Sequence, residues 1–318
     1  MTRNVAKPKS AKGSKHGDAT RVTLGPPAIL GAALAAPPLI EGLPPTPRFS
    51  APFMTETNGG SSLENVPGFD AYVARSNGLF ATKTNSRPRD PDDRTWVAQS
   101  IIGEDDRVPV SDTTALPWRC IAHLDITYSS GKRATGTAWF LGRRALGTAG
   151  HNIFHKDYGK ASRILVTPGY DGYSAPFKSY HVADAHCPVE WLAGHGGLEH
   201  DYGVLLLDTD EPGSKLGWFG YASYSEPQLA GLQVNVSGYG IDRTPATQYY
   251  NGGRLTDVTD DFLIYPFDTE GGMSGAPIFA LFSDNRRVAV GVHTYGGTSE
   301  NRARRIDDTV FDFFRLHG

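Results

Sequence analysis

Three short segments of the sequence contain the residue types of a hydrolytic triad. They are LGTAGHNIF with His151, EHDYGVLLLD with Asp201 and DTEGGMSGAPIF with Ser274. A serine hydroxyl is a weak nucleophile at neutral pH, so it needs an imidazole base, and the imidazole needs a carboxylate that holds its tautomer. The three residues can fill these roles, and together they predict hydrolysis through an acyl-enzyme.

The order of these residues and the glycines beside Ser274 narrow the prediction. His, then Asp, then Ser is the chain order of chymotrypsin-type enzymes. In α/β-hydrolases the Ser comes first and lies in a G-x-S-x-G turn. Here Ser274 is followed by Gly275 and Ala276, so the second glycine of that motif is missing. A glycine two residues before the nucleophile lets a backbone N–H turn inward, so we expect the N–H groups of Gly272 and Ser274 to form the oxyanion hole. Taken alone, G-G-M-S-G is also compatible with a turn that has no chemical role.

The elements that must position these segments are short and strand-like. The 318 residues include 37 Gly, 22 Pro, 15 Phe and 14 Tyr, which is typical of many short strands joined by tight turns. No helical period appears after Ser100 until IDDTVFDFFRL, which predicts a closing helix that begins near Asp307 and Asp308. We expect an all-β fold, either antiparallel barrels or a sandwich, built from CIAHLDITY, GTAWFLG, RALGTAG, RILVTPG, YGVLLLD, LQVNVSGYG, DFLIYPF, APIFALF and VAVGVHTY.

Composition and charge exclude other functional classes. The net charge is −3 without long blocks of one sign, so the chain lacks the signature of a nucleic-acid binder. Two Pro-Pro pairs interrupt the one extended apolar stretch, residues 22–43, so we expect no stable membrane insertion. Basic residues precede this stretch, but its apolar core is poor for a signal peptide, which leaves secretion open.

From Ser100 to about Phe314, the sequence resembles the glutamyl endopeptidases of bacilli and staphylococci, the bacterial branch of the chymotrypsin-like serine proteases. The segments that carry the likeness are, in order, SIIGEDDRVPVSDTTALPWR, TAGHNIF, HDYGVLLL, GWFGY, VSGYG, DTEGGMSGAPIF and VHTYGGTSENRARRI. The resemblance implies two six-stranded antiparallel β-barrels of chymotrypsin type with the active site between them. It also implies a secreted zymogen that acts on protein or peptide substrates without a metal or organic cofactor, and we expect a monomer.

The resemblance also places the domain boundaries. It implies a mature N-terminus near Ser100, which makes residues 1–99, with 12 of the 22 Pro, a poorly structured prosequence. Residues 100–318 become the protease domain, with the first barrel at about 100–205, the second at about 206–303 and the helix at about 306–316. Gln99-Ser100 is not a Glu-Xaa bond, so maturation is expected to need a second protease.

A substrate pocket follows from the same resemblance. In the family, a Thr five residues before the nucleophile and a His on the next strand line the pocket for the carboxylate of the substrate's P1 side chain; these positions here are Thr269 and His293. A hydroxyl and an imidazole can both hydrogen-bond a carboxylate, which implies cleavage after Glu and less well after Asp. A His on an apolar strand can also be a purely structural residue, and that alternative stays open at this point.

Several positions depart from the family's pattern. Met273 precedes the nucleophile where animal relatives have an acidic residue that pairs with the new N-terminal amine, so activation by that ion pair is not expected. Relatives from bacilli carry a disulfide at positions that match Gly136 and Asn152, so this link is absent. Cys120 and Cys187 either pair with each other or remain thiols.

Two alternatives to an ordinary protease remain. One is a catalytically silent, protease-like binding module, which the presence of His151, Asp201 and Ser274 argues against. The other is a protease that acts mainly on its own chain. A metal site is not expected, because the residues that could bind zinc follow no standard spacing: His181, His186, Cys187, His195 and His200.

Overall fold

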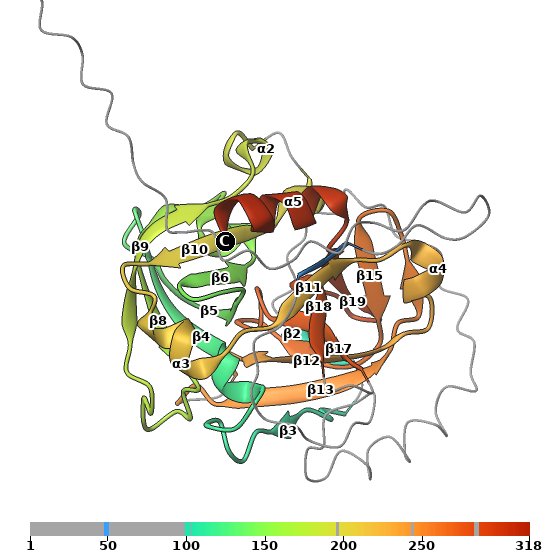
Figure 1. The fold of residues 1–318 in the computed structure, drawn as a ribbon, viewed down its shortest axis with the longest axis horizontal. Coiled ribbons are helices and arrows are strands. Elements are labelled where there is room, and N and C mark those ends of the chain that lie inside the picture. Colours follow the sequence, from blue (N-terminus) through green and yellow to red (C-terminus); the bar gives the residue numbers. More distant parts are fainter. Residues whose placement is uncertain (1–47, 51–98, 103, 195–196, 243–244, 283–285) are drawn as a thin grey trace, which may run out of the picture. The chain divides into compact units, whose positions relative to one another are not determined.

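The computed structural model consists mainly of antiparallel strands (Figure 1). It describes residues 48–50, 99–102, 104–194, 197–242, 245–282 and 286–318. All of these lie in one compact unit, Pro44–Gly318. The predicted N-terminal extension lies outside the described residues, apart from residues 48–50 and residue 99.

Six strands close into a barrel in the first half of the described chain. Strand β4 pairs with both β5 and β8, so the sheet with the order β4-β5-β6-β10-β9-β8 closes on itself. Strand β7 pairs with Gly159 and Lys160 at the start of β8. Burial alternates along β4, with Leu124 and Ile126 in the core and their neighbours partly exposed. The strands are β4 (Ile121–Tyr128), β5 (Arg133–Phe140), β6 (Ala145–Thr148), β7 (Phe154–His155), β8 (Gly159–Pro168), β9 (Tyr180–His186) and β10 (Gly203–Leu207).

The second large sheet is curled but stays open. Its order is β14-β15-β19-β18-β17-β12-β13-β3, with β11 parallel to β18 and β1 antiparallel to β11. Val236, Leu263 and Ile278 are completely buried in its core. The strands are β1 (Arg48–Ser50), β3 (Val108–Pro109), β11 (Gly220–Ser223), β12 (Gln233–Tyr239), β13 (Gln248–Arg254), β14 (Asp257–Val258), β15 (Phe262–Tyr265), β17 (Pro277–Leu281), β18 (Arg287–Gly296) and β19 (Asn301–Arg305).

The predicted all-β fold is confirmed, and the structure refines its second half. Within the described residues no ladder joins β14 to β3, the two end strands of this order, each of which has two residues. Val258 of β14 packs in the core of this sheet, whereas Val108 of β3 packs in a separate cluster with Val110, Trp118 and Tyr250. The expected second barrel is therefore a curled half-barrel.

A C-terminal helix, α5 (Asp308–His317), covers part of the core, as the sequence predicted. Asp307 caps it, because its side chain accepts a hydrogen bond from the N–H of Val310 at 2.9 Å. The buried Phe314 packs edge-on against Trp139, with ring centroids 6.0 Å apart. The remaining elements are short: β2 (Gln99–Ser100), β16 (Thr269–Glu270), η1 (Trp118–Cys120), η2 (Gly150–Asn152), η3 (Leu198–His200), α2 (Val189–Leu192), α3 (Glu211–Leu216) and α4 (Glu226–Leu229).

Strand β1 anchors residues 48–50 at the edge of the second sheet. Arg48 donates to Asp312 of α5 at 2.9 Å, and its guanidinium lies 4.6 Å above the ring of Phe311. The hydrogen bond from Arg48 lowers the pKa of Asp312 to about 2. This part of the expected prosequence therefore contacts α5, and no residue of α5 lines the pocket described below.

Cys120 and Cys187 do not form a disulfide with each other. Cys120 is buried and its Sγ donates to the carbonyl of Leu216 at 3.2 Å. Cys187 is half-buried, and burial raises its pKa to about 12. Both side chains are therefore thiols, which decides between the two alternatives that the sequence left open.

His123 in β4 predicts a loss of stability in acid. Its ring lies against Tyr170 and Tyr239, and its buried Nε2 atom has no hydrogen-bond partner among the described residues. Burial lowers the pKa of His123 from 6.5 to about 4, so between these values the unfolded chain binds a proton that the folded chain does not. The free energy of unfolding should therefore fall by about 3 kcal/mol as the pH drops through this window.

Replacement of His123 by Gln is expected to reduce the decrease in the free energy of unfolding between pH 6.5 and about 4. The test is urea unfolding at several pH values from about 7 down to about 4. Asp268 acts in the opposite direction, because burial raises its pKa to about 7 and its protonation therefore favours the folded state as the pH drops. Comparison with a His181→Gln control, at an exposed histidine, isolates His123 from this background. Equal slopes in the two variants would contradict the prediction.

Candidate active site

His151 and Asp201 form a buried, hydrogen-bonded pair. Strands β6 and β10 pair with Thr148 opposite Gly203, so the residues just after β6 and just before β10 meet at one end of the barrel. The ring Nδ1 and the backbone N of His151 each lie 2.8 Å from a carboxylate oxygen of Asp201. Asp201 is completely buried. A proton held on Nδ1 in this way leaves Nε2 as the basic atom of the ring.

Ser274 lies in a turn that depends on the glycines beside it. The φ angles of Gly272 and Gly275 are +94° and +92°, which side chains rarely adopt. A Cβ on Gly275 would lie 2.1 Å from the carbonyl oxygen of Thr137, and one on Gly272 would lie 2.6 Å from that of Tyr239. Both conformation and space therefore require glycine at these two positions.

The loop before Ser274 presents backbone donors. In the described part of the chain, the N–H groups of Gly272 and Ser274 donate to no backbone carbonyl. Between them, the N–H of Met273 donates to the carbonyl of Glu270 at 2.9 Å. The side chain of Met273 is completely buried in the core of the second sheet. An apolar residue therefore suits position 273, and two N–H groups remain available for an oxyanion.

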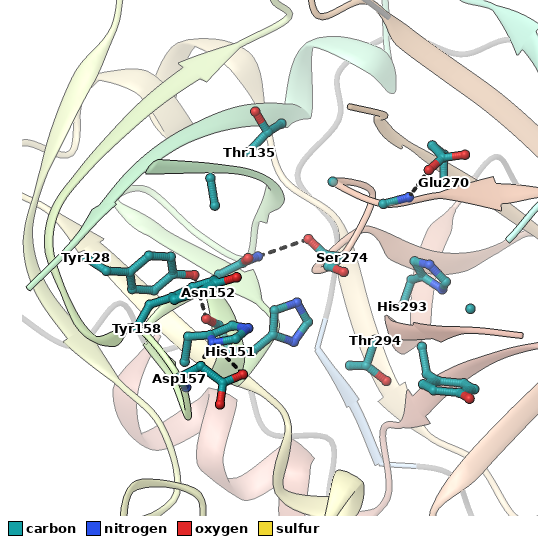
Figure 2. Close-up of a pocket in the computed structure, with 16 residues that line it drawn as sticks. Tyr128, Thr135, His151, Asn152, Asp157, Tyr158, Glu270, Ser274, His293 and Thr294 are labelled. Carbon is teal, nitrogen blue, oxygen red and sulfur yellow. Dashed lines mark hydrogen bonds and ion pairs between the residues drawn. The ribbon is translucent and has the colours of Figure 1, made fainter. Parts of the chain in front are cut away.

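A pocket of about 370 Å³ brings most of the sequence-predicted residues together. His151 reaches it from the first barrel, and Ser274 reaches it from the loop before β17 (Figure 2). Gly272 of the same loop also lines the pocket. Asp201 lies behind His151 and does not line the pocket. The lining residues are Tyr128, Ala134, Thr135, His151, Asn152, His155, Asp157, Tyr158, Glu270, Gly271, Gly272, Ser274, His293, Thr294, Tyr295 and Gly296.

His293 lines the pocket from β18 and is held by a tyrosine that the sequence did not reveal. The hydroxyl of Tyr265 in β15 lies 2.7 Å from Nδ1 of His293. Burial, and then the nearby His151, lower the pKa of His293 to about 3, although the carbonyl of Arg302 acts in the other direction. The imidazole is therefore neutral near pH 7. In the tautomer in which Nδ1 accepts from the Tyr265 phenol, the ring proton lies on Nε2. No motif or spacing in DFLIYPF marks Tyr265 as its partner.

Thr269 is completely buried, and its hydroxyl has no hydrogen-bond partner among the described residues. It does not line the pocket, in contrast to Glu270, the residue after it. Burial raises the pKa of the Glu270 carboxyl, which accepts a hydrogen bond from the N–H of Gly271 at 2.9 Å. Among the described residues that line the pocket there is no Lys or Arg, so its side-chain donors for a carboxylate are uncharged groups and histidines.

Three aromatic side chains form a wall beside His151. The hydroxyl of Tyr128 donates to the carbonyl of His151 at 2.8 Å. His155 stacks on Tyr158 with ring centroids 4.1 Å apart, and all three residues line the pocket. Sequence patterns did not single them out, because Tyr128 ends β4, His155 ends β7 and Tyr158 lies in the turn after β7, so they share no spacing.

Sequence comparison identifies the family. No family model matches the chain. It is 36% identical over 239 residues to the glutamyl endopeptidase of Bacillus licheniformis, which covers 73% of each chain. The chain belongs to the glutamyl endopeptidase family. It is a serine endopeptidase and acts on protein or peptide substrates.

Two further similarities concern another bacillus protein and the fold. The chain is 32% identical over 220 residues to a Bacillus subtilis protein named extracellular metalloprotease, covering 69% of this chain and 70% of that one. A solved structure of a Glu endopeptidase superposes with a TM-score of 0.59 at 22% identity, covering 68% of this chain and 97% of that one. The fold is therefore that of the chymotrypsin-like proteases, as predicted.

Neither a metal-binding cluster nor a membrane-spanning helix is found among the described residues. No group of three or more His, Cys, Asp or Glu among the described residues is placed to hold a metal ion. His195, one of the residues considered for zinc, lies outside the described residues. No described helix is both long and apolar enough to cross a membrane.

Proposed function

We propose that Ser274, His151 and Asp201 are the catalytic triad of this serine endopeptidase and that it cleaves after glutamate. The observation that carries the proposal is the carboxylate of Asp201, which holds both the backbone and the ring of His151 in a pocket that Ser274 also lines. Such a carboxylate fixes the tautomer in which Nε2 accepts the serine proton, and its charge stabilises the imidazolium that results.

The reaction then follows from these groups. Ser274 Oγ attacks the scissile carbonyl carbon while Nε2 of His151 takes the hydroxyl proton, and the N–H groups of Gly272 and Ser274 bind the oxyanion. The imidazolium gives its proton to the leaving amine as the C–N bond breaks. Water next attacks the acyl-enzyme and gives its proton to Nε2, which returns a proton to Oγ as the acid product leaves. Asp201 stays ionised throughout.

We propose that His293, which lines the pocket, binds the P1 carboxylate together with Thr269, which is buried next to the pocket residue Glu270 in the chain. Support comes from the buried, unpartnered hydroxyl of Thr269 and from the neutral His293 ring, whose Nε2–H the Tyr265 hydrogen bond favours. Hydrogen bonds to an ionised acceptor are stronger than those between neutral groups, so uncharged donors can select a carboxylate. The name of the Bacillus licheniformis relative points to the same substrate.

A peptide library that varies P1 tests the specificity. Thr269→Val is expected to lower kcat/KM for Glu substrates about 10- to 100-fold, because it removes a hydrogen bond to a charged group, and to change kcat/KM for Ala at P1 by less. The control is Thr256→Val, which removes an exposed hydroxyl bonded to the carbonyl of Ile264. Cleavage after Lys or Arg by the wild type would contradict the proposal and would indicate that Glu270 binds the P1 side chain.

We further propose that residues 1–99 are the prosequence of a secreted zymogen and that residues 100–318 are the protease domain, with the barrel at about 100–205 and the half-barrel at about 206–303. The name of the Bacillus subtilis relative supports an extracellular location. N-terminal sequencing of protein from the culture medium should give a first residue near Ser100. A chain that keeps Met1 and stays inside the cell would contradict the proposal of a secreted zymogen. Size-exclusion chromatography should show a monomer.

A further inference from the structure

Asn152 connects the two sides of the active site. It follows His151 directly in η2, and its side-chain Nδ2 donates to Thr148 Oγ1 at 2.9 Å. The same atom donates to the carbonyl of Ser274 at 3.0 Å (Figure 2). Asn152 is only 2% exposed, so water does not replace these bonds readily. One amide group therefore links the loop of the candidate base to the backbone of the candidate nucleophile.

The peptide group between Ser274 and Gly275 is held at both ends. Its carbonyl accepts hydrogen bonds from the N–H of Thr137 at 2.9 Å and from Asn152, and its N–H donates to the carbonyl of His293 at 2.7 Å. The orientation of this peptide sets ψ of Ser274. Movement of the peptide would therefore displace the side chain that must face the substrate carbonyl.

Asn152 also fills space that would otherwise belong to a second side chain. A Cβ on Gly136 would lie 2.7 to 2.9 Å from the amide atoms of Asn152. The resemblance to relatives from bacilli implies a disulfide at these two positions in those relatives. A disulfide there would join two parts of the first barrel, whereas the amide reaches beyond that barrel to Ser274.

We infer that Asn152 is a positioning residue for the reaction, because its amide holds the carbonyl of Ser274 and so fixes the direction of the nucleophile. The inference rests on the proposed role of Ser274. The bonded carbonyl is not among the groups proposed to bind substrate. Loss of this hydrogen bond should therefore reduce kcat and leave KM nearly unchanged.

The test replaces Asn152 by Leu in the full chain, which keeps a similar volume and removes the donor. We expect kcat to fall about 10- to 100-fold with KM within about threefold of the wild type. A covalent organophosphonate, used as an active-site titrant, counts the competent sites and should react more slowly by a similar factor. Asn235→Leu is the matched control, because Asn235 is also buried and donates to a backbone carbonyl, that of Phe279 at 3.1 Å, outside the pocket.

Equal losses of kcat in the Asn152 and Asn235 variants, or an effect confined to KM, would overturn the inference. Asn152→Asp is a second variant of the same shape for the case that the Leu variant does not fold. An ionised carboxylate cannot donate to a carbonyl, so this variant should also lose kcat, and an unchanged kcat would overturn the inference.

Ser274→Ala separates this inference from the proposed function. Activity at the wild-type level in Ser274→Ala would refute the nucleophile itself. An inactive Ser274→Ala beside fully active Asn152 variants would refute only the positioning role.

Discussion

Replacement of Ser274 by Ala is expected to lower kcat by about a millionfold, the scale at which other triad hydrolases lose activity without their nucleophile. The reason is that no acyl-enzyme can form, while the oxyanion donors and the substrate pocket remain. The double replacement of Ser274 and His151 by Ala should cost little more than the single one. The two side chains act as one unit, so their effects are far from additive.

The measurement is kcat on a Glu-containing peptide, with mass spectrometry to exclude contaminating proteases. Ser237→Ala serves as the control, because Ser237 is also buried and donates to the carbonyl of Tyr249 at 2.9 Å, away from the pocket. That variant should keep kcat. A fall of less than about a thousandfold in Ser274→Ala would mean that another group attacks the substrate.

Asp201→Asn is expected to lower kcat by about ten thousandfold at neutral pH, the size of the effect in the chymotrypsin-type template. The ionised carboxylate accepts from both the backbone N–H and the ring Nδ1–H of His151, at 2.8 Å each. An asparagine can keep one of these acceptor bonds, but its NH₂ group then faces Nδ1. The ring proton would move to Nε2, and His151 could no longer take the proton of Ser274.

The control for this prediction is Asp125→Asn on the same barrel. Its carboxylate pairs with Arg133 at 2.7 Å on the surface, so its loss should change kcat by less than about twofold. Circular dichroism of both variants would check that the fold is intact. A fall of less than about tenfold in Asp201→Asn would contradict the role of Asp201 as the group that orients His151.

The sequence by itself determined the all-β fold class and predicted the chemistry, because both depend on local patterns. Strand alternation around Leu124 and Ile126, and the capped apolar face of α5, follow from the spacing of neighbouring residues. The glycine-rich turn at Ser274 and the segments around His151 and Asp201 indicated a candidate triad without any coordinates.

Only the tertiary structure decided which distant residues meet. The β6–β10 ladder brings His151 to Asp201, 50 residues away, and packing places Tyr265 against His293 and the amide of Asn152 against Ser274. The tertiary structure also showed that the second sheet stays open. The physical reason is that such contacts depend on strand register and side-chain packing over the whole domain, which local periodicity does not record.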